Sequence, residues 1–308
     1  MRKKLFWFVA ILLLGVWGHH VWLRIGKPDM NDEVRAKAGK KSVALSAGTT
    51  AYEYADGEGD PVVLVHGFSV PSVIWDNTFA ALKNADRAVL RYDLFGRGYS
   101  DRPDAKYNSE LYVSQLKELV DKLLTDKKIV LCGLSMGGAI SVAFTDKYPD
   151  KVAKVILIDP AGFPMPAPGV TKLIKAPGIG TYFGRLFARR AMAQGLPENF
   201  VAAVPPRVTE ESLKQIDYAG YADAIVSTVR HMDMTGMEPA YRRVGEKKIP
   251  TLLIWGKKDK IIPFANAALV KKAIPGAEVL ELENAGHIPT VDEDKKVHAV
   301  IREFLAGE

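Results

Sequence analysis

The chain has 308 residues but a single cysteine, Cys132, which excludes a disulfide bond within the chain. No cluster of His and Cys has the spacing of a metal site and no glycine-rich phosphate loop is present, so we expect neither a metal nor a cofactor. Residues 1–41 hold nine Lys and Arg against three Asp and Glu, whereas residues 42–308 hold 33 of each. The basic excess therefore lies in the N-terminal segment, and the body has no charge bias toward nucleic acid.

The chain is long enough for one large domain with an insertion, and 48% of it is hydrophobic. Short apolar runs typical of buried parallel strands alternate with helical patterns. These runs are residues 62–66, 88–92, 129–133, 154–158, 251–256 and 278–282. Two alternating runs around Ala47-Gly48 predict a hairpin at one edge. The pattern predicts an α/β fold, with a mostly parallel eight-stranded sheet and helices on both faces.

One interval, between Asp159 and Ile249, is too long for a single crossover and opens with the proline-rich run 163–168. Short helical patterns with several methionines and aromatics follow. We expect residues 163–245 to form a helical cap inserted into a core of residues 42–162 and 246–308. Methionines are typical of core packing, and an apolar acyl pocket in the cap is a hypothesis drawn from its Met, Phe and Leu content.

The strand at residues 129–133 continues as Gly-Leu-Ser-Met-Gly-Gly, which contains Gly-x-Ser-x-Gly. A sharp turn from strand to helix exposes the serine hydroxyl beside the first amides of the helix. Gly133 and Gly137 carry no side chains that would obstruct this turn. The pattern predicts Ser135 as a nucleophile.

A serine hydroxyl needs a general base, and the base needs an acid to orient it. Asp259 and His287 follow two successive predicted strands, at the sheet edge where open α/β folds place their sites. The order serine, acid, histidine favours this pair. Asp159, at the end of another strand, is the alternative acid.

An oxyanion hole would complete the site. The strand ending at Val65 runs into His66-Gly67-Phe68, and the glycine lets the loop approach the serine. We expect the backbone N–H groups of Phe68 and Met136 to be the two donors.

These motifs resemble the α/β-hydrolase superfamily from about Ser42 to the C-terminus. The matching runs are His66-Gly67-Phe68, 93–100, 133–138, 256–259 and Gly286-His287. A serine in place of aspartate as nucleophile argues against the dehalogenase and epoxide-hydrolase branches. The framework together with an N-terminal anchor resembles membrane-anchored monoacylglycerol lipases, and C–C hydrolases of aromatic degradation share much of it.

The resemblance implies a serine esterase or lipase that cleaves lipid-like or medium-chain acyl esters through an acyl-enzyme on Ser135. One alternative is a C–C bond hydrolase, for which Arg185, Arg189 and Arg190 are candidates to hold a substrate carboxylate. The other alternative is a ligand sensor that keeps the fold without catalysis. The expected partners are a small-molecule ester and membrane lipid.

The N-terminal segment contains no Asp, Glu, Lys or Arg from Leu5 to Leu23. As a helix, these residues would span roughly 30 Å, the thickness of a bilayer core. We expect an uncleaved transmembrane anchor in residues 1–25 and a polar linker in residues 26–41; the competing interpretation is a cleaved signal peptide. The basic residues 2–4 favour a cytoplasmic N-terminus and so, slightly, a catalytic domain on the exoplasmic (periplasmic) side. The basic residues that follow the predicted span favour the opposite orientation.

Overall fold

The computed structural model describes Trp7, Leu14, Gly15, Gly18 and His19, and then residues 26–125, 127–166, 170–176 and 179–307. Its centre is one eight-stranded sheet with the order β1-β2-β4-β3-β5-β6-β7-β8. The strands are β1 (Lys41–Leu45), β2 (Gly48–Ala55), β3 (Glu58–Val65), β4 (Arg87–Tyr92), β5 (Ile129–Leu134), β6 (Val152–Ile158), β7 (Thr251–Gly256) and β8 (Glu278–Leu282). The β1–β2 and β2–β4 pairs are antiparallel and all others are parallel, which confirms the predicted sheet.

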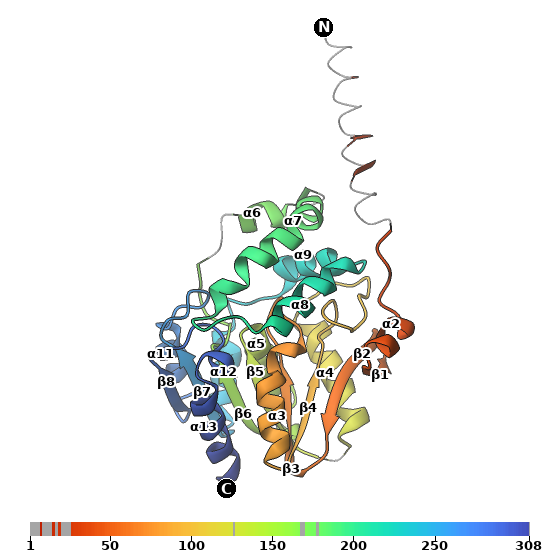
Figure 1. Cartoon of the computed structure of the whole chain (residues 1–308). Helices are drawn as coiled ribbons and strands as arrows, with labels where there is room; N and C mark the ends of the chain where they lie inside the picture. Colours follow the sequence, from red (N-terminus) through yellow and green to blue (C-terminus); the bar gives the residue numbers. More distant parts are fainter. Residues whose placement is uncertain are drawn as a thin grey trace.

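The central strands are buried on both sides because helices cover both faces of the sheet (Figure 1). One face is covered by α3 (Asp76–Asn84), α12 (Pro289–Asp292) and α13 (Asp294–Ala306). The other is covered by α4 (Ser109–Leu123), α5 (Met136–Lys147), α10 (Glu238–Glu246) and α11 (Asn266–Ala273). Each face has its own hydrophobic core. Two-sided burial explains why these strands appear in the sequence as continuous apolar runs.

Between β6 and β7, four helices lie above the carboxyl ends of the parallel strands (Figure 1). They are α6 (Val170–Lys175), α7 (Ile179–Gly195), α8 (Pro206–Lys214) and α9 (Tyr221–His231). The long helix α7 packs against the other three. The fifth helix of this interval, α10, packs instead against α5 and α11 beside the sheet. A short helix, α2 (Asp32–Lys37), precedes β1.

The structure corrects the predicted transmembrane anchor. Among the described residues, no helix is both long enough and apolar enough to cross a bilayer. The prediction concerned residues 1–25, most of which lie outside the described residues. One of the described residues, His19, hydrogen-bonds through its ring to the hydroxyl of Tyr182 on α7 at 2.9 Å, so this end of the predicted span contacts a polar group of the protein. The predictions of a single-pass membrane location and of lipid binding through this helix are therefore wrong.

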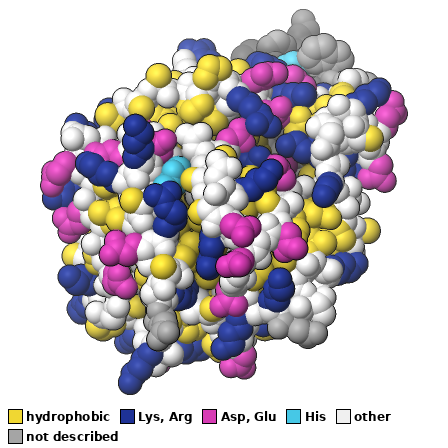
Figure 2. Space-filling view, turned by 60° about the horizontal axis from the view of Figure 1, so that its bottom comes forward, with side chains coloured by type: hydrophobic (Ala, Val, Ile, Leu, Met, Phe, Trp, Pro, Cys, Tyr) yellow, Lys and Arg dark blue, Asp and Glu magenta, His cyan; other side chains and the backbone are white. Residues whose placement is uncertain are grey.

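The surface opposite the four helices carries charges of both signs, interspersed with apolar side chains (Figure 2). No extended region of one sign dominates this face. This distribution agrees with the equal numbers of acidic and basic residues in residues 42–308. A polyanion would find no continuous basic surface here.

Candidate active site

Ser135 occupies the turn between β5 and α5, with φ 56° and ψ −121°. A non-glycine residue in this region of backbone space is strained, and such strain persists where the surroundings fix it. Here the N–H of Ser135 donates to the carbonyl of Ile158 at 2.9 Å, and the Ser135 carbonyl accepts from Gly138 at 2.9 Å and from Ala161 at 3.0 Å. The turn is thus tied to β6 and to α5, and it presents a side chain that is 8% exposed.

Small residues are required around this turn. A Cβ at Gly137 would overlap the carbonyl oxygen of Val65, and one at Gly133 would overlap that of Gly137. A Cβ at Gly67 would lie 3.3 Å from the Cβ of Ser135. The loop after β3 therefore lies directly against Ser135, as the sequence analysis expects.

His287 and Asp259 come together from the loops after β8 and β7. The Nδ1 atom of His287 lies 2.7 Å from Oδ2 of Asp259. The other oxygen of Asp259 accepts the N–H groups of Ile261 at 2.7 Å and Ile262 at 2.9 Å. The carboxylate is fully buried and the His287 side chain is 4% exposed. Three nitrogen atoms thus converge on one carboxylate and fix its orientation toward His287.

Ser135 and His287 line the same cavity. Among the hydrogen bonds of the described residues, none within 3.5 Å joins the hydroxyl of Ser135 to the ring of His287. Bonds of this kind are often long in the absence of substrate and shorten in the reacting complex. The structure thus brings Asp259 onto His287 and places Ser135 in the same cavity.

Asp159, the alternative acid, lies at the end of β6 with φ 41° and is fully buried. Its Oδ1 accepts the N–H of Gly256 at 3.0 Å. Burial, reinforced by the charge of Asp259, raises the pKa of Asp159 well above its usual range. A carboxyl whose charged form is disfavoured in this way is poorly suited to stabilise an imidazolium. The hydrogen bond to His287 comes from Asp259.

The two expected oxyanion donors flank Ser135. Phe68 lines the cavity beside the serine, and Met136 begins α5 directly after it. Neither backbone N–H donates a hydrogen bond to another described residue. Both donors are thus available to a ligand atom held near Ser135.

His66, in the loop that carries Phe68, has no free ring nitrogen. Its Nε2 accepts the N–H of Leu94 at 2.9 Å, and its Nδ1 lies 2.9 Å from the carbonyl oxygen of Gly67. Burial lowers the pKa of His66 to about 4, so the ring is neutral at pH 7. His66 therefore holds the loop in place and is unavailable as a base.

A cavity of about 470 Å³ opens above Ser135, between the sheet and helices α6, α7 and α9. This volume lies in the usual range for small-molecule sites. Its wall is almost entirely apolar, and none of its described lining residues is Asp, Glu, Lys or Arg. Aliphatic and aromatic side chains from the three helices form the wall: Leu173, Ile174, Phe183, Phe187, Met192, Tyr221, Ile225 and Val226. Such a cavity suits an uncharged hydrocarbon chain.

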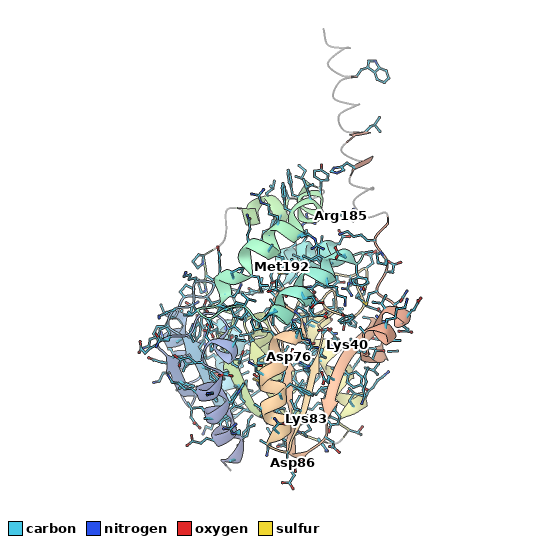
Figure 3. All side chains as sticks on the ribbon, viewed as in Figure 1. Lys40, Asp76, Lys83, Asp86, Arg185 and Met192 are labelled. Carbon is cyan, nitrogen blue, oxygen red and sulfur yellow. The ribbon has the colours of Figure 1, made fainter. Side chains whose placement is uncertain are left out.

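The arginines considered for carboxylate binding lie away from this cavity. Arg185 on α7 donates to both carboxylate oxygens of Asp223 on α9, at 2.9 and 2.8 Å. Arg189 pairs with Asp217, and Arg190 is exposed. Figure 3 shows Arg185 and Met192 on α7; of the two, Met192 lines the cavity.

The sequence analysis missed Asp292, which follows His287 by five residues. One of its oxygens accepts the N–H groups of Val201 at 3.0 Å and Ala202 at 2.8 Å, and the other accepts that of Gly286 at 2.7 Å. It thus joins the segment after α7 to the loop that carries His287. Its partners Val201 and Ala202 lie 91 and 90 residues away, and no local motif marked it.

Comparisons with known proteins agree with this fold. The family model described as "Alpha/beta hydrolase family" matches residues 62–300. Lipase 1 of Psychrobacter immobilis is 32% identical over 278 residues, which cover 87% of this chain and 85% of the lipase. The 2-hydroxy-6-oxo-2,4-heptadienoate hydrolase of Pseudomonas putida is 24% identical over 298 residues, 89% of this chain and 99% of that protein. The solved esterase of Exiguobacterium antarcticum has a TM-score of 0.73 at 20% identity, covering 86% of this chain and 98% of the esterase.

Proposed function

The chain belongs to the alpha/beta hydrolase family, and we propose that it is a serine esterase or lipase acting on uncharged esters with apolar acyl chains, such as monoacylglycerols. In this proposal Ser135 is the nucleophile, His287 the general base and Asp259 the acid that orients it. Helices α6 to α9 act as the cap over the acyl chain. Relatives named as lipases support a carboxylic ester hydrolase.

The observation that carries the proposal is the cavity itself. Ser135 and His287 are its principal reactive groups, and most of the remaining wall is apolar. Burial of hydrocarbon against such a wall gives about 25 cal/mol per Å² of apolar surface, which favours esters with more than a few carbons. A charged acyl group would lose its hydration there without gaining a partner of opposite charge.

The reaction follows from the proposed roles. His287 takes the proton of the Ser135 hydroxyl as the hydroxyl oxygen adds to the ester carbonyl carbon. The negative oxygen that forms accepts hydrogen bonds from the N–H groups of Phe68 and Met136. His287 then gives the proton to the leaving alcohol as the ester bond breaks, which leaves an acyl-enzyme. Water, activated by His287, adds to this intermediate and releases the acid and the free serine.

The main alternative is C–C bond hydrolysis, favoured by the Pseudomonas putida relative. The name of that relative denotes a carboxylate substrate, which requires a cationic or strong hydrogen-bonding partner in the pocket. The cap arginines Arg185 and Arg189 are already paired with acidic side chains. The ester proposal therefore fits the described residues better.

Two experiments test the proposal. A fluorophosphonate probe should label the wild-type protein at Ser135 and leave Ser135→Ala unlabelled, which also separates an enzyme from a ligand sensor. A series of p-nitrophenyl esters from acetate to laurate should then give kcat/KM values that rise with chain length. If Ser135→Ala hydrolyses the esters as fast as the wild type, the proposal fails.

A further inference from the structure

Arg97, in the loop between β4 and α4, has a fully buried side chain. All the hydrogen-bond acceptors of its guanidinium among the described residues are neutral: the carbonyls of Phe68 and Phe95 and the hydroxyls of Tyr112 and Thr228. A buried cation without an acidic partner carries a large desolvation cost. The contacts of Arg97 on its two sides show which groups it holds in place.

One side of Arg97 contacts the residue that carries the expected oxyanion donor. Its Nε donates to the carbonyl oxygen of Phe68 at 2.9 Å, and its guanidinium carbon lies 5.5 Å from the centroid of the Phe68 ring. The backbone and the side chain of Phe68 are thus held by the same group. The next carbonyl, that of Ser69, accepts from Nε2 of Gln215 at 2.7 Å, so the two peptides that directly follow the Phe68 N–H are fixed from outside.

The other side of Arg97 contacts the cap. Its NH2 group donates to the hydroxyl of Thr228 on α9 at 2.9 Å, and that hydroxyl lies 3.0 Å from the hydroxyl of Tyr112. Thr228 is fully buried and lies outside the cavity wall. Ile225 and Val226 of the same helix form part of that wall. A single guanidinium therefore connects the helix against which the acyl chain would pack to the residue that would stabilise the oxyanion.

We propose that Arg97 is a positioning residue that couples the placement of α9 to the direction of the Phe68 N–H. The inference rests on the proposed function, because it assigns a support to the oxyanion hole of that site. An oxyanion donor acts only if it points at the position that the negative oxygen reaches in the transition state. Loss of Arg97 therefore lowers kcat while leaving binding of the acyl chain nearly unchanged.

The test compares Arg97→Met, Arg97→Lys and Thr228→Val with Arg91→Met as the matched control. Arg91 is also a buried arginine, but it pairs with Glu53 and Asp76 and lies outside the cavity wall. Active sites are counted by fluorophosphonate titration, so that kcat refers to folded enzyme. We expect Arg97→Met to lower kcat by about 30-fold or more with KM within about threefold, as for a misplaced catalytic group. Arg97→Lys, which keeps a donor for the Phe68 carbonyl, should recover part of this loss, and Arg91→Met should keep kcat within about twofold.

A second readout isolates the oxyanion. A trifluoromethyl ketone with a medium alkyl chain forms a negatively charged adduct with the serine, whereas an alcohol of equal length only fills the pocket. The inhibition constant of the ketone should rise in Arg97→Met and Thr228→Val in proportion to the loss in kcat, with that of the alcohol unchanged. Should Arg97→Met fail to fold, Thr228→Val and Arg97→Lys carry the same comparison.

The inference is overturned if kcat and ketone affinity in Thr228→Val and the Arg97 variants equal those of the wild type or fall only as in Arg91→Met. Ser135→Ala separates this failure from that of the proposed function. If Ser135→Ala is inactive while the Arg97 variants are normal, only the positioning role is wrong. If Ser135→Ala keeps its activity, the proposed function fails, and the positioning role with it.

Discussion

The Nδ1 atom of His287 lies 2.7 Å from Oδ2 of Asp259, and the opposite oxygen of that carboxylate accepts two backbone N–H groups. This contact decides which ring nitrogen is free. A carboxylate can only accept, so Nδ1 carries the proton and the lone pair of Nε2 remains available. Nε2 is the atom that the proposed mechanism needs to take the proton of Ser135.

Replacing Asp259 by Asn should therefore lower activity far more than stability. The amide can donate to Nδ1 and thus select the wrong tautomer, which we expect to lower kcat by about 10³-fold or more. The amide oxygen can still accept the N–H groups of Ile261 and Ile262, so the loop should fold. Steady-state hydrolysis of p-nitrophenyl butyrate at pH 8 provides the measurement. Full activity of Asp259→Asn would transfer the role of the acid to Asp159.

Asp159→Asn should alter the pH dependence of stability instead. Because burial raises the pKa of Asp159, the folded protein keeps a proton that the unfolded chain releases above pH 3.8. The free energy of unfolding therefore falls as the pH rises from about 4 through the folded-state pKa of this group. An amide cannot titrate, so Asp159→Asn should lose this part of the pH dependence.

Urea unfolding of the wild type and of Asp159→Asn at pH 5 and pH 8 tests this linkage. The free energy of unfolding of the variant minus that of the wild type should be larger at pH 8 than at pH 5. Equal differences at the two pH values would show that Asp159 has the same charge in the folded and unfolded states over this range.

The strands and the expected triad could be predicted from the sequence because their signals are local. Each buried strand is a continuous apolar run, and Ser135 lies in a short motif whose glycines the turn requires. The expected acid and base each follow directly after a strand, so the order of elements alone brought them to one edge of the sheet. The catalytic roles themselves stay predictions until the variants are measured.

The supports of the site could not be predicted, because they come from contacts between distant residues. Arg97 meets Thr228 across 131 positions, and Asp292 meets Val201 across 91. Neither pair has a local signature, since arginine in a loop and aspartate in a short helix are usually exposed. The anchor prediction is contradicted because, in the part of the chain that the structure describes, no helix is long and apolar enough to cross a bilayer.

Asp292→Asn should impair catalysis by loosening the His287 loop. Gly286 donates to one carboxylate oxygen, Ala202 to the other and Val201 to both, and an amide has only one oxygen to accept. One side must therefore lose its acceptor, at about 1–3 kcal/mol if that group stays buried. We expect a lower melting temperature and a loss of about tenfold in kcat, comparable to a small misplacement of a catalytic group.

Asp294→Asn is the matched control for this variant. It makes the same change two residues later, where the carboxylate accepts, from the residues described, only the N–H of Lys295. Thermal unfolding and ester hydrolysis of the two variants should differ clearly. If both behave like the wild type, Asp292 has no part in holding the His287 loop.

The preference for long or short acyl chains should depend on the empty space in the part of the cavity that α9 lines. Ile225 lines this wall, and a tryptophan there would occupy much of the approximately 470 Å³ cavity above Ser135. We expect Ile225→Trp to reduce kcat/KM for p-nitrophenyl laurate by about tenfold or more, because each buried CH₂ that loses its place costs about 0.8 kcal/mol. Hydrolysis of the acetate should change by less than about threefold, since its acyl group stays beside Ser135. Leu269→Trp, at an exposed position on α11 outside the cavity wall, is the control for adding an indole. If Ile225→Trp slows acetate and laurate by the same factor, the acyl chain binds elsewhere.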